Sequence, residues 1–306
     1  MRVAIIGCGY VGVALGKLLA GSGHTVFGVR RSNVGDAELT AAGIIPLHAD
    51  ITQPASLSQL PKPLDAVVNL VSSSKGGASE YRQVYLQGTE NLLAHFTPTS
   101  LHRYIHVSST SVYAQTDGSW VDESSPATAS GDTGQLLLEA EQRLERAHAA
   151  SDFPGIVVRA SGIYGPGRGH LFQQFVRGEA RAMGDSSRWI NMIHRDDLAA
   201  ALATLMDRGT PGALYLANDN LPVQEREFFD WLCETFQRPY PEPADPSAVG
   251  RRKRGFSSKR VSNARLRAAG WDPAYPTYRE GYAPMVQEQL QLQGSSVSES
   301  HGNGPR

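Results

Sequence analysis

The chain has 306 residues, a length that suits one core domain with a smaller second lobe better than two independent domains. Its 29 basic and 30 acidic side chains give a formal charge of −1, which excludes the large basic excess of proteins that bind nucleic acid or anionic membranes. Cys8 and Cys233 are the only cysteines, so a disulfide framework is excluded and a reducing, cytoplasmic location is expected. No run reaches about 18 uninterrupted apolar residues, and no membrane span is expected.

In the first half of the chain, short apolar runs alternate with segments of helical spacing. The apolar runs span residues 3–6, 25–29, 44–47, 66–71, 104–107 and 156–158. Apolar residues recur at helical spacing in residues 11–19, 80–96 and 136–150. Short unbroken apolar runs are typical of strands buried on both faces, and strands that alternate with helices predict an α/β fold with a doubly wound parallel sheet.

The pattern of alternating strand-like and helix-like segments ends after Gly162, where loop-like and helix-like segments follow without strict alternation. We therefore assign residues 1–165 to the core domain and residues 166–189 and 219–286 to a smaller C-terminal lobe. A helical pattern and an apolar run within residues 190–218 predict that this segment rejoins the sheet. Residues 287–306 are polar and contain glycine, so a disordered tail is expected.

A glycine-rich turn, Gly7-Cys8-Gly9-Tyr10-Val11-Gly12, follows the first predicted strand and opens the first predicted helix. In this context Gly7 permits the tight turn, Gly9 lets a pyrophosphate approach the backbone, and Gly12 lets the helix pack closely on the strand. The first N–H groups of the helix, including those of Tyr10 and Val11, would bind the anion together with the positive end of the helix dipole. The turn predicts a dinucleotide site of the Rossmann type.

The end of the second predicted strand distinguishes NADP from NAD. An acidic residue there would bind the ribose 2′-hydroxyl of NAD, but this chain has Arg30 and Arg31, and its next acid is Asp36. Two guanidinium groups suit the 2′-phosphate of NADP, since they form charge-assisted, fork-like hydrogen bonds. The sequence favours NADP over NAD, with solvent-exposed surface arginines as the alternative interpretation.

Further motifs follow in a fixed order and together resemble those of the extended short-chain dehydrogenase/reductases, a group that includes nucleotide-sugar epimerases and dehydratases. The matching segments are Asp50-Ile51, Asn69-Leu70-Val71-Ser72, Gly88-Thr89-Glu90-Asn91-Leu92-Leu93, Ser108-Ser109-Thr110-Ser111-Val112-Tyr113, residues 159–167 and Ile193-His194-Arg195-Asp196-Asp197. The resemblance extends to about residue 286 and implies a Rossmann core with a substrate-binding C-terminal lobe. It also implies that Asp50 contacts the adenine amine and that Ile51, Val71 and Ser72 lie beside the cofactor.

The same resemblance exposes a departure at the catalytic Tyr-x-x-x-Lys pair. Thr133 occupies the position of the tyrosine and Leu137 that of the lysine. A threonine hydroxyl is a much weaker acid than a phenol, whose pKa is about 10, and leucine offers no charge to assist it. Tyr–Lys chemistry is therefore not expected in this chain.

Other residues are candidates for the missing chemistry. Ser109 matches the family's catalytic serine or threonine and would polarise a carbonyl by hydrogen bonding. Lys75 follows the fourth predicted strand and would lie over the nicotinamide, although a solvated loop lysine is the simpler interpretation. Asp132 adjoins Thr133 and is more simply a helix cap, and Tyr85 replaces a family asparagine and is more simply a core residue.

The resemblance implies an NAD(P)-dependent oxidoreductase or an epimerase/dehydratase-like enzyme that acts on a small carbonyl, hydroxyl or nucleotide-sugar substrate without Tyr–Lys catalysis. Thr133 and Leu137 favour an alternative, a non-catalytic NADP(H)-binding sensor or regulatory protein, whereas Ser109 favours an enzyme. His170 and His194 form no ligand motif, so no metal site is expected. By analogy with the family, the helical segments 80–96 and 136–150 imply a homodimer. Neither nucleic acid nor a membrane is expected as a partner.

Overall fold

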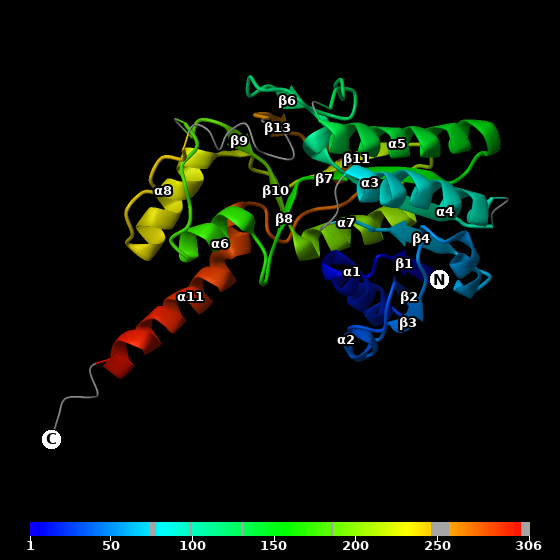
Figure 1. Cartoon of the computed structure of the whole chain (residues 1–306), viewed down its shortest axis with the longest axis horizontal. Coiled ribbons are helices and arrows are strands. Elements are labelled where there is room, and N and C mark those ends of the chain that lie inside the picture. The colour runs from blue at the N-terminus through cyan, green and yellow to red at the C-terminus, as the bar shows by residue number, and fades with distance from the viewer. Residues whose placement is uncertain (74–77, 98–99, 130, 185, 246–256, 301–306) are drawn as a thin grey trace.

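The computed structural model describes residues 1–73, 78–97, 100–129, 131–184, 186–245 and 257–300, with the backbone alone for residues 78 and 294–300 (Figure 1). Its centre is a seven-stranded sheet in the order β11-β7-β5-β4-β1-β2-β3, in which every neighbouring pair is parallel. The strands are β1 (Arg2–Ile6), β2 (Thr25–Arg30), β3 (Ile45–His48), β4 (Ala66–Asn69), β5 (Arg103–Ser109), β7 (Gly155–Ala160) and β11 (Leu214–Ala217). The predicted doubly wound parallel sheet is confirmed.

Helices cover both faces of this sheet. One face carries α1 (Tyr10–Gly21) and α7 (Arg195–Arg208), which pack against each other, and the other carries α4 (Gly88–Phe96) and α5 (Asp132–Ser151) (Figure 1). The short helices α2 (Asp36–Ala41) and η1 (Pro54–Gln59) flank β3. Successive side chains of β1 alternate between two apolar cores, with Ile5 on the α1 side and Ile6 on the α4 side. This double burial explains why the strands have continuous apolar sequences.

The helical pattern at residues 80–96 forms three successive segments. These are α3 (Ala78–Tyr81), the π-helix η2 (Arg82–Gln87) and α4. The wider π-helical turns place Val84 and Leu86 in the interior, where a continuous α-helix would space its buried residues differently. A short 3₁₀ turn, η3 (Thr110–Val112), follows β5.

A second, smaller lobe has its own apolar core. Its helices are α6 (His170–Val176), α8 (Glu225–Phe236) and α11 (Tyr278–Ser300), and its strands pair as β8 (Gly162–Tyr164) with β10 (Met192–His194) and β9 (Trp189–Ile190) with β12 (Val223–Gln224). The short helix α10 (Ala264–Ala268) instead packs on β11 of the central sheet, with Leu266 in the core on the α1 side. A further parallel pair joins β6 (Trp120–Val121) to β13 (Arg260–Val261). Aromatic side chains dominate the lobe's core, including Phe172, Phe228 and Tyr282.

Two segments of the C-terminal half bear on the sequence predictions. Helix α7 and strand β11 return the chain to the central sheet, as the pattern in residues 190–218 predicts. Helix α11, in contrast, continues to Ser300 through the segment for which disorder is expected, and it extends away from the body of the molecule (Figure 1). Residues 287–293 contain only glutamine, glutamate and leucine, which are good helix formers, so their polarity does not prevent a helix. Residues 301–306 lie outside the described part.

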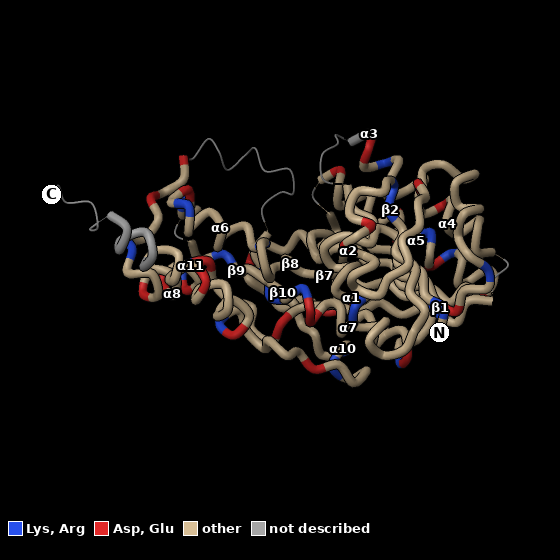
Figure 2. Tube along the Cα trace, turned by 90° about the horizontal axis from the view of Figure 1, so that it is seen from below, with Lys and Arg blue, Asp and Glu red and all other residues tan. Residues whose placement is uncertain are grey.

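Acidic and basic residues are interspersed along the chain in both lobes (Figure 2). Throughout the part of the chain that the structure describes, no helix combines the length and apolarity needed to cross a membrane.

Candidate functional site

The three glycines of the turn between β1 and α1 serve different purposes. Gly7 has a φ of +77°, and a Cβ added to it would lie 2.8 Å from the backbone N and Cα of Val71. A Cβ at Gly12 would lie 3.1 Å from Ile5 Cγ2 and 3.3 Å from the Cys8 sulfur. At Gly9 the nearest heavy atom would be the Gly7 carbonyl oxygen, 3.9 Å away. Gly7 and Gly12 are therefore required by packing, whereas Gly9 borders open space.

That open space lies at the N-terminus of α1. Gly9 is the N-cap residue and supplies no side-chain cap, and the first turn of the helix carries no acidic residue. The N–H of Val13 donates to the Gly9 carbonyl at 2.8 Å and closes the first turn of the helix. The N–H groups of Tyr10, Val11 and Gly12 precede it and can bind an anion at the positive end of the helix dipole. The residues present therefore fit the diphosphate of a dinucleotide.

Two arginines from the distant half of the chain flank this turn. The guanidinium carbons of Arg168 and Arg195 lie 5.2 Å and 5.1 Å from the centre of the Tyr10 ring. The Tyr10 hydroxyl donates to the Pro166 carbonyl at 3.1 Å, which fixes the ring between the lobes. Arg195 also pairs with Asp196, at 2.8 Å. Neither Arg168 nor Arg195 is predicted from the sequence as a site residue, because each lies more than 150 residues from Tyr10 along the chain.

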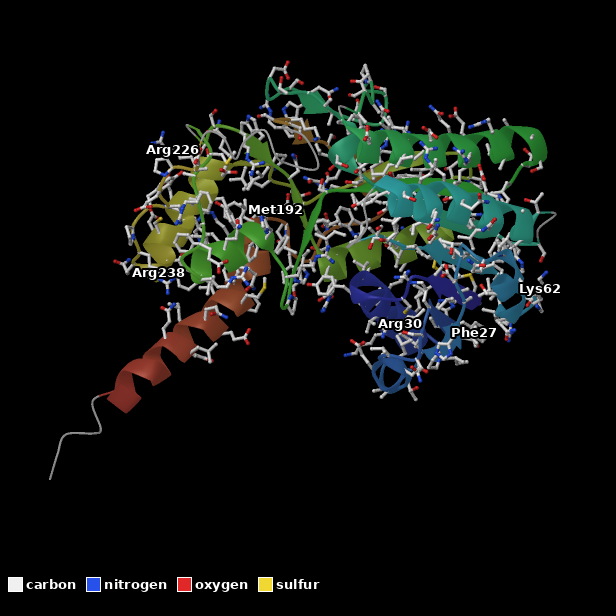
Figure 3. All side chains as sticks on the ribbon, in the orientation of Figure 1. Phe27, Arg30, Lys62, Met192, Arg226 and Arg238 are labelled. Atoms are coloured by element: carbon white, nitrogen blue, oxygen red, sulfur yellow. The ribbon has the colours of Figure 1, made fainter. Side chains whose placement is uncertain are left out.

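The two arginines after β2 have different environments. Arg30 folds back over the turn, where its Nε donates to the Cys8 carbonyl at 2.6 Å (Figure 3). Its other nitrogens donate to the Val34 carbonyl and to Glu38, the latter at 3.0 Å. Arg31 is exposed. The structure thus brings Arg30 into the glycine turn, with part of its charge balanced by Glu38.

The predicted adenine-side residues lie at the end of β3. One carboxylate oxygen of Asp50 accepts hydrogen bonds from the Thr52 N–H at 2.9 Å and the Thr52 hydroxyl at 2.8 Å. Ile51 is buried, and its carbonyl accepts from the Asn91 amide at 2.7 Å. A Cβ at Gly88 would lie 2.4 Å from Ile51 Cδ1, so this glycine lets α4 approach the strand. Asp50 is therefore held in a fixed turn at the edge of the sheet.

The segment after β4 lies directly beside the glycine turn. The Val71 N–H donates to the Asn69 side-chain oxygen at 3.2 Å, and Ser72 is exposed. The Ser73 N–H donates to the Tyr85 hydroxyl at 3.3 Å, so Tyr85 both packs in the core and holds this loop. Lys75 lies outside the described residues.

The segment after Ser109 approaches the first turn of α5, which carries Thr133. The Ser109 hydroxyl accepts from the Ser111 N–H at 3.2 Å. A Cβ at Gly134 would lie 3.7 Å from the Ser111 carbonyl oxygen, so the first turn of α5 approaches the segment after Ser109. Thr133 is half-buried in that turn.

Leu137 lies one turn further along α5 and is only 5% exposed. Its apolar cluster contains Val112, Tyr113, Val121, Leu216 and Val261. The position for which the sequence resemblance predicts the lost lysine therefore holds a packed apolar side chain.

A buried ion pair lies next to this cluster. Arg159 on β7 and Glu141 on α5 approach to 2.6 Å, and the Ser108 hydroxyl also donates to Glu141. The Arg159 guanidinium carbon lies 4.9 Å from the centre of the Tyr113 ring. Burial opposes the charge of Arg159, but the hydrogen bonds and charge of Glu141 outweigh it and raise the pKa of the guanidinium. These contacts join β5, α5 and β7 beneath Ser109.

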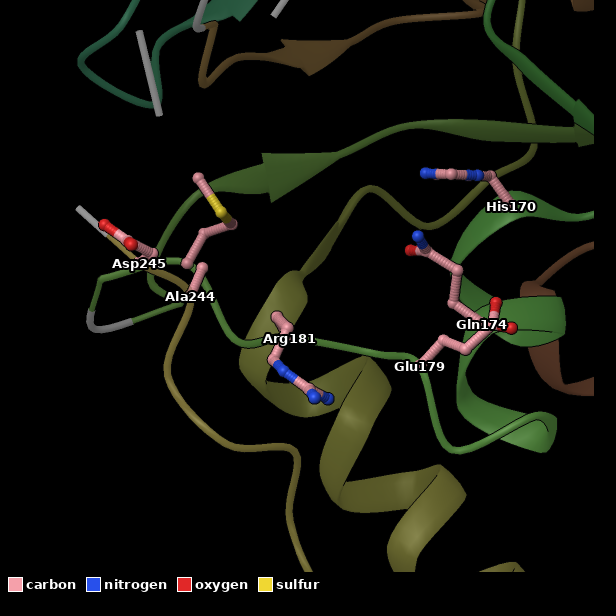
Figure 4. Close-up of a pocket in the computed structure, with 7 residues that line it drawn as sticks. His170, Gln174, Glu179, Arg181, Ala244 and Asp245 are labelled. Atoms are coloured by element: carbon pink, nitrogen blue, oxygen red, sulfur yellow. The ribbon is translucent and has the colours of Figure 1, made fainter. Parts of the chain in front are cut away.

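The two histidines have separate environments. His194 caps α7, since its Nδ1 accepts from the Asp196 N–H at 3.2 Å, and its ring centre lies 4.0 Å from that of Tyr275. Burial lowers the pKa of His194. His170 instead lines a hollow of about 380 Å³ in the second lobe, together with Gln174, Glu179 and Arg181 (Figure 4). Within the described residues, no group of three or more potential ligands could hold a metal ion.

A second hollow, also of about 380 Å³, lies between α3 and α5. Its lining includes Ser79, Arg82, Asp132 and Glu139. Gly131 is the N-cap residue of α5 and no side chain caps the helix, so the expectation that Asp132 is the cap is wrong. Asp132 is the first helical residue, where its negative charge faces the positive end of the helix dipole. Neither hollow includes the glycine turn.

Comparison with known proteins places this geometry in a family. The model of the NAD dependent epimerase/dehydratase family matches residues 3–217. Protein YeeZ of Escherichia coli (strain K12) is 26% identical over 221 residues, which cover 70% of this chain and 76% of the relative. The 2-alkyl-3-oxoalkanoate reductase of Stenotrophomonas maltophilia is 26% identical over 262 residues, covering 78% and 77%.

Solved structures agree with this assignment. A Methylobacillus flagellatus protein of the NAD-dependent epimerase/dehydratase type is 34% identical with a TM-score of 0.73, covering 94% of this chain and 98% of its own. The fold alone is shared with a dTDP-glucose 4,6-dehydratase of Streptomyces venezuelae with NAD bound, at 21% identity and a TM-score of 0.82, over 96% and 98% of the chains. The fold is also shared with a human epimerase family protein with NADPH, at 21% identity and a TM-score of 0.76. The match covers 94% of this chain and 99% of the human chain. The chain therefore belongs to the NAD dependent epimerase/dehydratase family.

Proposed function

We propose that the protein is an NADP(H)-dependent oxidoreductase that acts on a small carbonyl, hydroxyl or nucleotide-sugar substrate without a Tyr–Lys pair. The observation that carries the proposal is the open, positively charged turn at the start of α1, where Gly9 borders free space and Arg30 contacts the turn. Family membership supports a nicotinamide dinucleotide as its ligand.

Arg30 supports NADP over NAD. Its guanidinium is anchored on the Cys8 carbonyl, at the end of β2 where the adenosine ribose binds in this fold class. Glu38 is a partner that a 2′-phosphate can replace or share, because the contact is exposed at the carboxylate. Arg31 is a solvent-exposed charge and contributes less than Arg30 to the affinity for the 2′-phosphate.

In the proposed reaction, NADPH supplies a hydride when bound, and the protein must orient the substrate and stabilise negative charge on its oxygen. Ser109 is the residue proposed to donate a hydrogen bond to that oxygen, since it ends β5 at the carboxyl edge of the sheet. Thr133, in the first turn of α5, would shape the site without donating the proton, which the reduced oxygen would take from solvent. The second lobe, residues 166–189 and 219–286, would close over the substrate.

The cofactor proposal is tested by fluorescence titration of NADPH and NADH. NADPH should bind more tightly, and Arg30→Met should raise its Kd by about tenfold while changing the Kd of NADH much less. Arg31→Met is the matched control and should shift both values by less than about twofold. Equal affinities for the two nucleotides, or a preference for NADH, would refute the argument from Arg30.

Catalysis is tested by NADPH oxidation with 3-oxo acids and by turnover of dTDP-glucose, the substrate types named for two relatives. Ser109→Ala should lower kcat by about a hundredfold, because the oxygen of the substrate loses its hydrogen-bond donor. Thr133→Ala should leave kcat within about threefold of the wild type. A loss near a thousandfold in the Thr133 variant would make that hydroxyl essential instead.

The second candidate function is a non-catalytic NADP(H)-binding sensor. It is favoured by Leu137, whose apolar packing removes the cation that assists proton transfer in the family. Tight NADPH binding without turnover of either substrate type, together with no effect of Ser109→Ala on any measured property, would support the sensor over the enzyme.

A homodimer through α4 and α5 also belongs to this proposal. Both helices lie on the same face of the sheet, and the exposed edge there carries the Arg143–Glu90 ion pair. Light scattering should give twice the monomer mass, and a monomer mass at micromolar concentration would contradict the dimer.

A further inference from the structure

Lys259 is an unusually placed charge just before β13. The residue is only 4% exposed, and its Nζ bonds to the Ser257 hydroxyl at 3.0 Å. No carboxylate forms an ion pair with it in the described part of the chain. Burial lowers its pKa to about 8, so most molecules still carry the charge at neutral pH.

The backbone around Lys259 is held on both sides. The Asn191 side chain donates to the Lys259 carbonyl at 2.9 Å and accepts from the Val261 N–H at 2.8 Å. On the other side, Ser258 exchanges backbone hydrogen bonds with Gln115 and Gly118, each at 2.9 Å. This segment is therefore rigid enough to position a side chain for binding.

Strand β13 places the Lys259 segment in the fold. Arg260 lies outward against Trp120 and Trp189, with its guanidinium carbon 5.1 Å and 5.0 Å from the ring centres. Val261 packs on the opposite face, in the cluster that contains Leu137. Lys259 directly precedes this strand, and the Ser258 N–H donates to the Gln115 carbonyl, so the backbone of this segment lies against the chain that follows Ser109.

A buried charge without a counter-ion lowers the stability of the folded protein. Such a residue is typical of sites where a ligand supplies the opposite charge. The preceding residues 246–256 contain four basic side chains and no acidic one, so the sequence near Lys259 adds no internal counter-ion. We propose that Lys259 binds an anionic oxygen of the substrate, a carboxylate or a phosphoryl group. This inference rests on the proposed function and narrows its substrate to anionic compounds.

The test is a calorimetric titration of the full-length protein loaded with NADP⁺. The probes are 3-oxooctanoate, its neutral methyl ester, and UDP-glucose as a phosphoryl compound. At least one anionic probe should bind about tenfold more tightly than the ester, and Lys259→Met should abolish this difference. Lys259→Arg should retain part of it, because the charge is kept. Binding of 3-oxooctanoate would indicate a carboxylate as the preferred group, and binding of UDP-glucose would indicate a phosphoryl group.

Lys62→Met is the matched control, since Lys62 is exposed at the far end of the core domain (Figure 3). It should leave the affinity for every probe unchanged. The thermal midpoint of Lys259→Met should equal or exceed that of the wild type, since an unpaired buried charge is removed. A lower thermal midpoint with unaltered affinities would assign Lys259 a structural role and overturn the proposal. The proposal would also be overturned if the wild type bound the ester as tightly as both anionic probes.

Failure of the proposed function has a different signature. In that case the wild type would bind neither NADP⁺ nor NADPH before any probe is added, and both proposals would fall. If the nucleotides bind and only the discrimination between anion and ester is missing, the inference about Lys259 alone is overturned.

Discussion

Leu137 illustrates at the residue scale how a packed apolar position disfavours a charged side chain. Its side chain is buried among the apolar residues that join α5 to β13. Leu137→Lys should therefore lower the free energy of unfolding by about 2–5 kcal/mol, because an ammonium replaces packed methyl groups. Urea unfolding measures this loss. Leu137→Met, which conserves volume and polarity, should cost less than about 1.5 kcal/mol, and equal costs for the two variants would contradict the packing argument.

The Glu141–Arg159 pair provides a second test at this scale. Both side chains are buried, so removal of one leaves the other as an unpaired charge. Glu141→Leu and Arg159→Met should each destabilise the protein by about 3–5 kcal/mol. The double variant should be less destabilised than the sum of the two single variants, as measured by denaturant unfolding. Additive losses would show that the two charges do not interact across β7 and α5.

At the scale of elements, the turn between β1 and α1 separates a packing glycine from a binding glycine. Gly7→Ala should lower the free energy of unfolding by about 1–3 kcal/mol, because its φ of +77° and the adjacent Val71 backbone exclude a Cβ. Gly9→Ala should change stability by less than about 1 kcal/mol, since it faces open space, yet weaken NADPH binding by about tenfold. Chemical unfolding and nucleotide titration of both variants check this. Unchanged nucleotide affinity in Gly9→Ala would remove the turn from the binding site.

The sequence predicts the central sheet well because its strands are buried on both faces, which leaves continuous apolar runs such as Val3 to Ile6. It does not predict the π-helix η2, since the segment is too short for its apolar spacing to distinguish a π-helix from an α-helix. It also misses the two-residue strands β6 and β13, which are too short to show a period. The extension of α11 past Gln287 is missed because a polar composition is typical of disordered tails, although glutamine, glutamate and leucine also have high helix propensity.

The candidate site is predicted only where its residues are contiguous. The glycine turn, Arg30 and Ser109 belong to local motifs, and the structure places them at one edge of the sheet. Arg168, Arg195 and Lys259 come from distant segments, so their contacts depend on how the second lobe packs against the core. A single sequence contains no signal for such contacts, since each residue alone is typical of a solvent-exposed surface.

At the scale of the whole molecule, Asp219 lies where the chain leaves β11 for the second lobe. It is 2% exposed, its N–H donates to the Met192 carbonyl at 2.8 Å, and its carbonyl accepts from Asn263. Its Oδ2 has no hydrogen-bond partner among the described residues. Burial raises the pKa of this carboxyl well above its usual range, and the charges of Asp197 and Glu280 raise it further.

The sign of the resulting pH dependence follows from linkage. A folded-state pKa above the unfolded value of about 3.9 means that Asp219 contributes stability below that pH, and the contribution is lost as pH rises through the folded-state pKa. Asp219→Asn imitates the protonated form and should escape this loss. The free energy of unfolding of the variant relative to the wild type should therefore increase from pH 5 to pH 8 in urea titrations. Asp207→Asn, at a side chain that is 79% exposed, should show no such trend. A constant difference for Asp219→Asn across this range would mean that the carboxyl between the lobes titrates as it does in the unfolded chain.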